Sequence, residues 1–583
     1  MKQQTETPSS QVIPPALIGI FYSPMGLMLL LAVSALFIAH FLEGRVSNAK
    51  LARARWAGSR EKTAARKLAC VQIQARKHNR VALFIGTPRR TRRGVVDGKT
   101  VTYLPEDNSR LYFPDVQRGV MVCGGAGSGK TFSMINPLIR SAIDQGLPII
   151  LYDFKYSQQE SPTDSAKGQT PKLAGYAATR GYKISLLAPG FAESAIANPI
   201  DFLQSETDAE MARQLAVVLN RNFKLTAGDK DGGFFGNAGD QLAQAIFMLT
   251  KGTCYPDVMM CQAILSLPKL VERIGQADLN PWVKASFSQF LSVAGSPETA
   301  ASIVGTASGI FSRFMIPSAL SAFCGQTTIP LSLTGKQMVV FGMDKEKRDV
   351  VGPLLVSILH LLVSRNVANK RKSPLVLALD ELPTLYLPAL VDWLNQNRED
   401  GLVSILGLQN LSLLEQAYGK ETTNAIFGGC ATKAIFNPQD DVAAERFSKF
   451  LGDEEIKYKQ RSRSTGGKSG ASTSLGDQNS TRSLFEVNQF NTLREGKAVI
   501  VSPGFSSRKD ISLPLLEQIS ISKEDITAES DSVKVWYELQ KQMRDKSILR
   551  EIAGEEMERR GLEADKLLPL LSPQDLAKKN SEF

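Results

Sequence analysis

The sequence of 583 residues contains few of the residues that build metal centres and disulfide frameworks. Its three histidines include no H-E-x-x-H arrangement, which excludes a zinc protease of that type. The six cysteines are scattered and form no C-x-x-C pair, so a reducing compartment is favoured over a disulfide framework. Hydrophobic residues make up 43% and charged residues 22% of the chain, which excludes wholesale disorder, collagen and a polytopic membrane protein. The length predicts roughly three to five domains.

The net charge of +11 is concentrated in one segment near the N-terminus. Residues 45–93 hold 15 lysines and arginines against the single acid Glu61, a net charge of +14, so the rest of the chain carries −3. Just before this segment, residues 17–39 are apolar and uncharged, and as a helix they would span about 34 Å, enough for a bilayer core. We expect one transmembrane helix with residues 44–583 in the cytoplasm. The alternatives are a signal peptide, for which Lys2 is the only preceding cation, and a basic segment that contacts DNA or anionic lipid.

Short, β-branched apolar runs alternate with helical patterns after the basic segment. Parallel strands that are buried on both faces require such runs, so the pattern predicts a doubly wound α/β sheet. The predicted strands are residues 119–123, 148–152, 184–187, 337–341, 375–379, 402–406, 433–436 and 498–501.

The remaining segments have other compositions. Between residues 204 and 325 a helical period replaces the strands and predicts an all-helical insertion. Residues 460–483 are rich in Ser, Gly, Thr, Arg and Lys, and are predicted to be a mobile loop. The domain prediction is residues 1–43 as tail and membrane helix, 44–100 as basic segment, 101–203 and 326–522 as the two parts of a nucleotide-binding domain, 204–325 as insertion, and 523–583 as a charged helical tail.

A G-x-x-x-x-G-K-T motif follows the first of these strands and precedes a helical pattern. Glycines in this arrangement let backbone N–H groups surround phosphates at a helix N-terminus, while Lys130 neutralises the β- and γ-phosphates and the Thr131 hydroxyl binds Mg²⁺. We therefore expect ATP and Mg²⁺ as ligands. The phosphate-binding residues are Gly124, Gly125, Ala126, Gly127, Ser128, Gly129, Lys130 and Thr131.

Two adjacent carboxylates follow the apolar run 375–379, at the strand end where α/β proteins bind ligands. Asp380 is predicted to hold Mg²⁺ through water, and Glu381 to orient and polarise the attacking water. Gln409 follows the next strand, from which its amide could sense the γ-phosphate. Arg398, expected on the preceding helix, is a candidate arginine finger for a neighbouring subunit, with a solvated surface arginine as the alternative.

From about residue 115 to 505 these motifs, in this order and spacing, resemble the coupling-protein ATPases of type IV secretion and conjugation. Besides the P-loop, Asp380, Glu381, Arg398 and Gln409, the resemblance includes Asn198-Pro199-Ile200-Asp201, Leu382-Pro383, Gly407-Leu408, Gln416-Ala417-Tyr418-Gly419, Phe427-Gly428-Gly429-Cys430 and Leu451-Gly452.

The resemblance implies a RecA-like domain with an all-alpha domain inserted into it, a homo-hexameric ring around a channel, and an N-terminus in the bacterial inner membrane. It also supports the catalytic roles of Arg398 and Gln409. The chain departs from the family's pattern in three places: only one membrane helix is evident, Asp153-Phe154-Lys155-Tyr156 replaces the usual Asp-x-Lys-Gly-Glu, and the tail follows no known pattern.

The function expected from this resemblance is ATP-driven recruitment and translocation of single-stranded DNA, with an attached relaxase, into a type IV secretion channel. A coupling ATPase for effector proteins is the alternative within the family. From another class, a cargo-docking receptor could use nucleotide only for assembly. A double-stranded DNA pump would need more membrane spans and a terminal domain that reads sequence, neither of which is evident.

Overall fold

The computed structural model describes residues 54–86, 92–96, 99–103, 111–161, 168–227, 234–464 and 472–572, together with Met28. The predicted membrane helix at residues 17–39 therefore lies outside the described residues, apart from Met28. The chain divides into two compact units, one of residues 1–54 and 452–484 and the other of residues 55–451 and 485–583. We call the second of these the main unit; the predicted domain boundaries within it stay a prediction.

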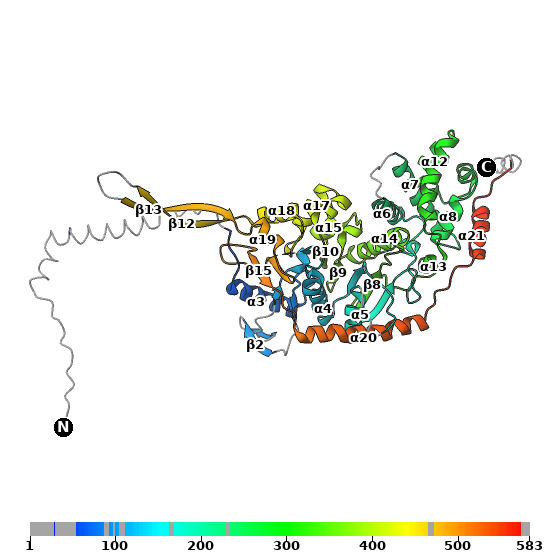
Figure 1. Ribbon diagram of the computed structural model, residues 1–583. Helices are drawn as coiled ribbons and strands as arrows, with labels where there is room; N and C mark the ends of the chain where they lie inside the picture. Colours follow the sequence, from blue (N-terminus) through cyan, green and yellow to red (C-terminus); the bar gives the residue numbers. More distant parts are fainter. Residues whose placement is uncertain are drawn as a thin grey trace, which may run out of the picture. The chain divides into compact units, whose positions relative to one another are not determined.

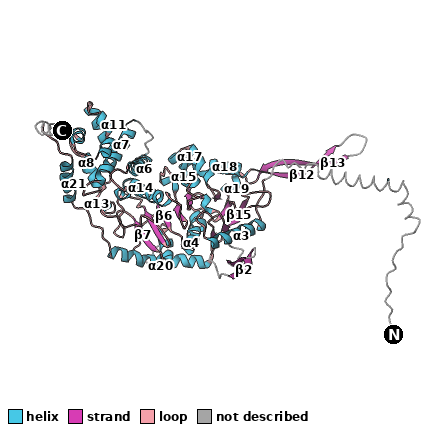
Figure 2. Cartoon of the chain, turned by 180° about the vertical axis from the view of Figure 1, so that it is seen from behind, coloured by secondary structure: helices cyan, strands magenta, loops and turns pink. Residues whose placement is uncertain are grey.

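A nine-stranded sheet forms the centre of the main unit (Figures 1 and 2). Its strand order is β15-β14-β11-β5-β10-β9-β6-β8-β7, and the seven strands from β11 to β7 are parallel, while β14 and β15 are antiparallel. The bounds are β5 Val120–Cys123, β6 Ile149–Asp153, β7 Lys183–Leu187, β8 Gln337–Gly342, β9 Leu375–Leu379, β10 Leu402–Leu408, β11 Thr432–Ile435, β14 Lys497–Val501 and β15 Pro514–Gln518.

Both faces of this sheet are covered, because successive residues of a strand contribute to different apolar cores. In β5, Val120 and Val122 join the core that contains helices α4 (Asn136–Asp144) and α5 (Thr170–Ala178), whereas Met121 and Cys123 join the core that contains α14 (Arg348–Val367). This two-sided burial explains why the strands appear in the sequence as continuous apolar runs. The prediction of a doubly wound α/β sheet is confirmed.

Helix α14 is the one helix of the described residues whose length and composition would suit a membrane span, but 83% of its apolar window is buried inside the protein. It packs against α6 (Ala209–Ala227) and is a core helix.

The segment between β7 and β8 is helical, as predicted. No strand occurs among the described residues from 209 to 320. Ser296 is the N-cap residue of α12 and Pro297 its first residue. After α6 the helices are α7 Phe234–Lys251, α8 Val258–Leu265, α9 Leu270–Gln276, α10 Pro281–Ser286, α11 Ser288–Ser292, α12 Pro297–Ser312 and α13 Pro317–Leu320.

Smaller elements complete the main unit. Helix α3 (Ser59–Ala75) precedes the short pairs β1 (Leu83–Ile85) with β4 (Leu111–Phe113), and β2 (Arg92–Val96) with β3 (Lys99–Tyr103). The helices after β9 are α15 Leu390–Asn395, α16 Leu411–Tyr418, α17 Lys420–Gly429, α18 Asp441–Leu451 and α19 Val487–Asn491. The tail forms α20 (Lys523–Asp545) and α21 (Gly554–Leu567).

In the other unit, residues predicted to form a mobile loop are paired in a β-hairpin. Strand β12 (Asp453–Ser464) is antiparallel to β13 (Ser472–Ser483) over their whole length. The loop prediction for residues 460–464 and 472–483 is therefore wrong. It failed because it was based on the lack of apolar residues for a core, whereas a two-stranded ribbon satisfies its backbone groups by pairing alone.

Candidate nucleotide site

The P-loop connects β5 to a helix, in the context that the motif requires. Residues 124–131 follow β5, and a π-helical turn (Thr131–Ile135) then continues into α4. Gly127 and Gly129 have φ angles of +72° and +85°, which residues with a Cβ rarely adopt. The backbone is thereby shaped to enclose an anion at the start of a helix.

Two segments distant in sequence contact the P-loop backbone. The N–H group of Gly125 donates to the carbonyl of Asn437 at 2.8 Å, and Gln439 Nε2 donates to the carbonyl of Ala126 at 3.0 Å. On the other side, the N–H group of Gly496 donates to the carbonyl of Ser128 at 3.0 Å. No local sequence pattern indicates these contacts, because they depend on the order of strands in the sheet.

The predicted carboxylates lie beside the P-loop. Strand β9 ends at Leu379, and Asp380 and Glu381 follow at the carboxyl edge of the sheet, where both are 9% exposed. Thr131 Oγ1 donates to Asp380 Oδ2 at 2.6 Å. Nζ of Lys130, which is 7% exposed, lies 3.6 Å from Glu381 Oε1. The structure therefore brings together the four side chains that the sequence assigned to phosphate, metal and water.

The oxygen atoms at this point fit Mg²⁺. Asp380 Oδ1 is buried and has no hydrogen-bond partner, and burial raises the pKa of this carboxyl group, an effect that the charge of Lys130 opposes. Among the described residues, no group of three or more His, Cys, Asp or Glu side chains is arranged to hold a metal ion by itself. One carboxylate and one hydroxyl suit Mg²⁺, which keeps several waters and takes its other ligands from substrate phosphates. Asp380 and Thr131 are the residues that would hold the ion.

Gln409 also reaches this cluster. It follows β10, which lies between β5 and β9 in the sheet, and its Nε2 donates to Glu381 Oε1 at 3.0 Å. The amide thus contacts the predicted water-activating carboxylate.

Arg398 is not close to the P-loop of its own chain. It lies in the turn after α15, not on the helix as expected, because α15 ends at Asn395. This turn precedes the amino end of β10, whereas Gln409 follows the carboxyl end, and seven residues of strand separate the two by about 23 Å. Arg398 Nε is buried without a hydrogen-bond partner. An action of Arg398 on bound nucleotide therefore requires a neighbouring subunit.

A cavity of about 210 Å³ opens beside the cluster, and sequence reasoning identified only part of its wall. Besides Thr131, Asp380 and Glu381, its lining consists of Asn136, Asp153, Phe154, Lys155, Gly168, Gln169 and Lys172. The buried Asp153 carboxylate accepts from the N–H groups of Lys155, Gln169 and Thr170 and from Thr170 Oγ1, at 2.6 to 3.1 Å. Asp153 thus connects the end of β6 to the start of α5.

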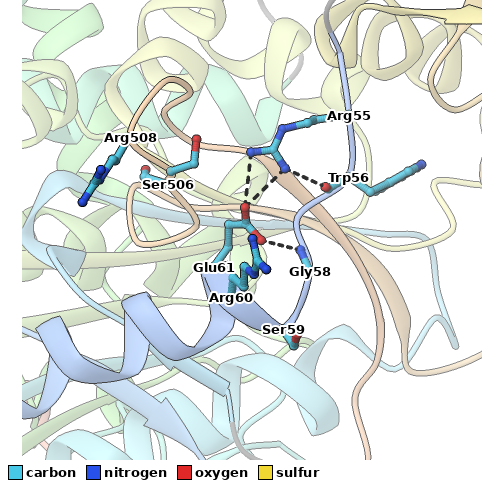
Figure 3. Close-up of a pocket in the computed structure, with 9 residues that line it drawn as sticks. Arg55, Trp56, Gly58, Ser59, Arg60, Glu61, Ser506 and Arg508 are labelled. Carbon is cyan, nitrogen blue, oxygen red and sulfur yellow. Dashed lines mark hydrogen bonds and ion pairs between the residues drawn. The ribbon is translucent and has the colours of Figure 1, made fainter. Parts of the chain in front are cut away.

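A second, larger cavity of about 760 Å³ is lined by residues 55, 56 and 58–61 of the predicted basic segment and by residues 506–508 (Figure 3). Arg55, Arg60 and Arg508 line it, together with Glu61. Glu61 accepts from the N–H group of Gly58 at 2.8 Å and from Arg55 at 3.2 Å, and these contacts lower the pKa of its carboxyl group. The single acid of the basic segment therefore caps α3 and neutralises one arginine, as Figure 3 shows.

The chain is similar to one family model and to several solved structures. Residues 374–495 match the family model described as the TraM recognition site of TraD and TraG. The unbound monoclinic form of the bacterial conjugative coupling protein TrwBdeltaN70 has the same fold, with a TM-score of 0.50 and 16% identity over 70% of this chain and 87% of that chain. Plasmid coupling protein TrwB in complex with ADP and Mg²⁺ gives a TM-score of 0.50 and 14% identity over 70% and 86%. No curated protein sequence matches the chain.

The fold and the site define a P-loop nucleotide-binding protein with a RecA-like sheet. The matching family model spans Asp380, Glu381, Arg398 and Gln409, and together with the shared fold it supports the resemblance to the type IV coupling proteins.

Proposed function

We propose that the protein is an inner-membrane ring ATPase that couples ATP hydrolysis to the recruitment and translocation of single-stranded DNA, with its attached relaxase, into a type IV secretion channel. One observation carries this proposal: Lys130, Thr131, Asp380, Glu381 and Gln409 meet at one edge of the sheet in a chain of the coupling-protein family. A protein that used nucleotide only for assembly would not need a carboxylate in the position of Glu381.

Each residue has a defined task in this proposal. Lys130 and the P-loop N–H groups bind the phosphates, and Asp380 and Thr131 hold Mg²⁺, which when bound neutralises phosphate charge. Glu381 accepts a proton from the attacking water, and Gln409 holds the Glu381 carboxylate in place. Arg398 neutralises charge on the nucleotide of the adjacent subunit, which makes hydrolysis depend on a homo-hexameric ring.

The proposed partners follow from the family. The description of the family model, TraM recognition, supports contact of residues 374–495 with a relaxosome protein of the TraM kind. The apolar segment 17–39 supports a single membrane span, with the bulk of the chain in the cytoplasm.

Steady-state ATP turnover with and without single-stranded DNA tests the proposal. We expect turnover that rises with DNA and disappears in Lys130→Ala. Nucleotide binding without turnover would instead indicate a docking receptor. A rate of ATP turnover that does not change with DNA but rises with a protein substrate would indicate an effector-secretion ATPase.

A further inference from the structure

The C-terminal tail contacts both the nucleotide-binding domain and the helical insertion. Helix α20 lies against α5, and α21 packs against α8 of the insertion (Figure 1). Eight residues, 546–553, connect the two tail helices and span at most about 29 Å. The tail is therefore a short physical link between the two domains of the main unit.

Helix α20 is built into the nucleotide-binding domain, not placed loosely on its surface. Trp536 is fully buried and belongs to the same apolar core as Leu173 of α5. Ser532 Oγ donates to the carbonyl of Pro171 at 2.7 Å and accepts from the N–H group of Tyr176 at 2.8 Å. A Cβ atom on Gly175 would collide with the carbonyl of Ser532, so the two helices approach as closely as a glycine allows.

Charged contacts of α20 reach the walls of the nucleotide site. Glu529 lies 3.0 Å from Nζ of Lys172, which lines the site cavity, and 3.9 Å from the buried Arg140 of α4. Arg140 also donates to the carbonyl of Asp525 at 2.9 Å. Because α4 continues from the P-loop and α5 holds Asp153, α20 fixes the two helices that shape the cavity relative to each other.

A buried glutamine of α20 holds the loop that follows Asp153. Gln540 Nε2 donates to the Tyr156 hydroxyl at 2.9 Å and to Glu193 at 2.7 Å, and its Oε1 accepts from the N–H group of Gln159 at 3.2 Å. Burial raises the pKa of the Tyr156 phenol, which stays neutral and donates to Glu193 at 2.7 Å. The segment 153–156, which replaces the family's usual motif, is thus bound by the tail.

Helix α21 holds the insertion through buried arginines. The Arg560 side chain, 9% exposed, donates to both oxygens of Asp257 at 2.6 to 3.1 Å and to Glu556 at 2.8 Å. Asp257 is the N-cap residue of α8. Arg273 of α9 donates to Asp565 at 2.8 Å and to the carbonyl of Leu568 at 2.6 Å. Removing one partner of the buried Arg560–Asp257 pair would leave an uncompensated charge, so this contact resists separation.

We propose that residues 523–568 form a brace that couples the nucleotide site to the helical insertion, with Glu529 and Gln540 as positioning residues at one end and Arg560 at the other. A change in the loop 153–161 or in α5 is transmitted through α20 to α8. By reciprocity, a change at the insertion alters nucleotide affinity. The proposal requires nucleotide binding at the P-loop but neither hydrolysis nor DNA transport.

The first test measures the affinity of the full chain for a fluorescent, non-hydrolysable ATP analogue with Mg²⁺. Arg560→Ala is compared with Arg559→Ala, which removes an exposed arginine of the same helix. We expect Arg560→Ala to change the dissociation constant about five-fold or more, the lower range of allosteric coupling, and Arg559→Ala to leave it unchanged. Lys130→Ala should abolish binding of the analogue. If it does not, the assigned nucleotide site is wrong; if it does and Arg560→Ala leaves the affinity unchanged, only the brace is contradicted.

The second test follows hydrogen exchange at the far end of the brace. In the parent chain, adding the analogue should change exchange in residues 258–265 and 554–567. Glu529→Gln should reduce this response, whereas Glu538→Gln, a change at an exposed position of α20, should preserve it. If Arg560→Ala alone does not raise exchange in α21, the double variant Arg273→Ala, Arg560→Ala is used. Release of α21 with unchanged nucleotide affinity would overturn the proposal.

Discussion

The side-chain amide of Gln409 donates a hydrogen bond of 3.0 Å to Oε1 of Glu381. The two residues follow neighbouring strands, β10 and β9, and meet because parallel strands end at the same edge of the sheet. Oε1 also lies 3.6 Å from Nζ of Lys130, so one carboxylate oxygen is held by an amide and an ammonium group.

Replacing Gln409 should therefore disturb catalysis more than binding. A hydrogen bond to a charged group contributes about 1.5–3 kcal/mol, so Gln409→Ala should reduce kcat about 10- to 100-fold with little change in nucleotide affinity. Gln416→Ala, at an exposed position of α16, is the matched control. Parallel measurements of ATP turnover and nucleotide binding distinguish the two effects. A loss of affinity without a loss of kcat would contradict the assigned role.

Lys130 and Glu381 should fail in different ways. Lys130→Ala removes a phosphate contact and should lose both binding and turnover. Glu381→Gln keeps the shape of the side chain but not the base, so turnover should fall about 10²- to 10⁴-fold while ATP stays bound. Filter binding with labelled ATP, followed by analysis of the bound nucleotide, checks this. Parent-like turnover in Glu381→Gln would remove the water-activating role.

The proposed role of Arg398 would make hydrolysis depend on ring assembly, because Arg398 lies at the opposite edge of the sheet from its own P-loop. Arg398→Ala should bind nucleotide nearly normally and lose about 10³-fold or more in turnover. Mixing Arg398→Ala with Lys130→Ala subunits should restore some activity, since a Lys130→Ala subunit supplies its arginine to an intact P-loop next to it. The mixture is titrated over several ratios. If crosslinking shows mixed rings but every ratio is inactive, the role of Arg398 in a neighbouring subunit is contradicted. Arg398 would then be interpreted as a solvated surface arginine.

The buried His360 of α14 should make stability depend on pH. It stacks on Trp393 with ring centroids 5.3 Å apart, and burial lowers its pKa to about 4. An unfolded histidine, with a pKa of about 6.5, binds a proton that the folded one excludes, so stability falls as pH drops from 6.5 towards 4. Between pH 7.5 and 5.0 this loss is about 2 kcal/mol. Urea denaturation should show that His360→Phe loses about that much less than the parent chain; equal losses would contradict the prediction.

The membrane anchor remains a prediction from the sequence, with a direct test. Deleting residues 1–43 should give a soluble chain that still binds nucleotide, because the site begins at β5. DNA transfer in cells should nevertheless fail. Membrane fractionation of cells that express the full-length chain tests this. Recovery of the full-length chain in the soluble fraction would refute the membrane span.

The parallel part of the sheet could be predicted because burial on both faces leaves a direct trace in the sequence. The seven apolar runs predicted between residues 119 and 436 correspond to β5–β11, and their ends differ by at most two residues. Strand β15 was missed because it is an edge strand that begins at Pro514 and is only partly buried, so it lacks the continuous apolar pattern. The hairpin was missed because it has no core.

The cluster of Lys130, Thr131, Asp380, Glu381 and Gln409 could also be predicted, since strand ends and a P-loop have strong local signals. The helical state of the tail could be predicted from the sequence, but its packing surface on α5 could not. Ser532 and Gln540 are buried polar residues whose partners are more than 340 positions away, so no local pattern could indicate them. Such contacts depend on tertiary packing alone.

The order of strands also has a consequence for how the chain is synthesised. Cys123 of β5 pairs with Leu408 of β10, so 285 residues must be made before the strand that carries the P-loop acquires its neighbour on that side. At about 5–20 residues per second, translation of this stretch takes roughly 15–60 s. During that interval both edges of β5 lack their partners, because β11 is made later still. Ribosome-bound chains that end before residue 402 therefore carry an unpaired apolar strand, the kind of segment that chaperones protect from aggregation.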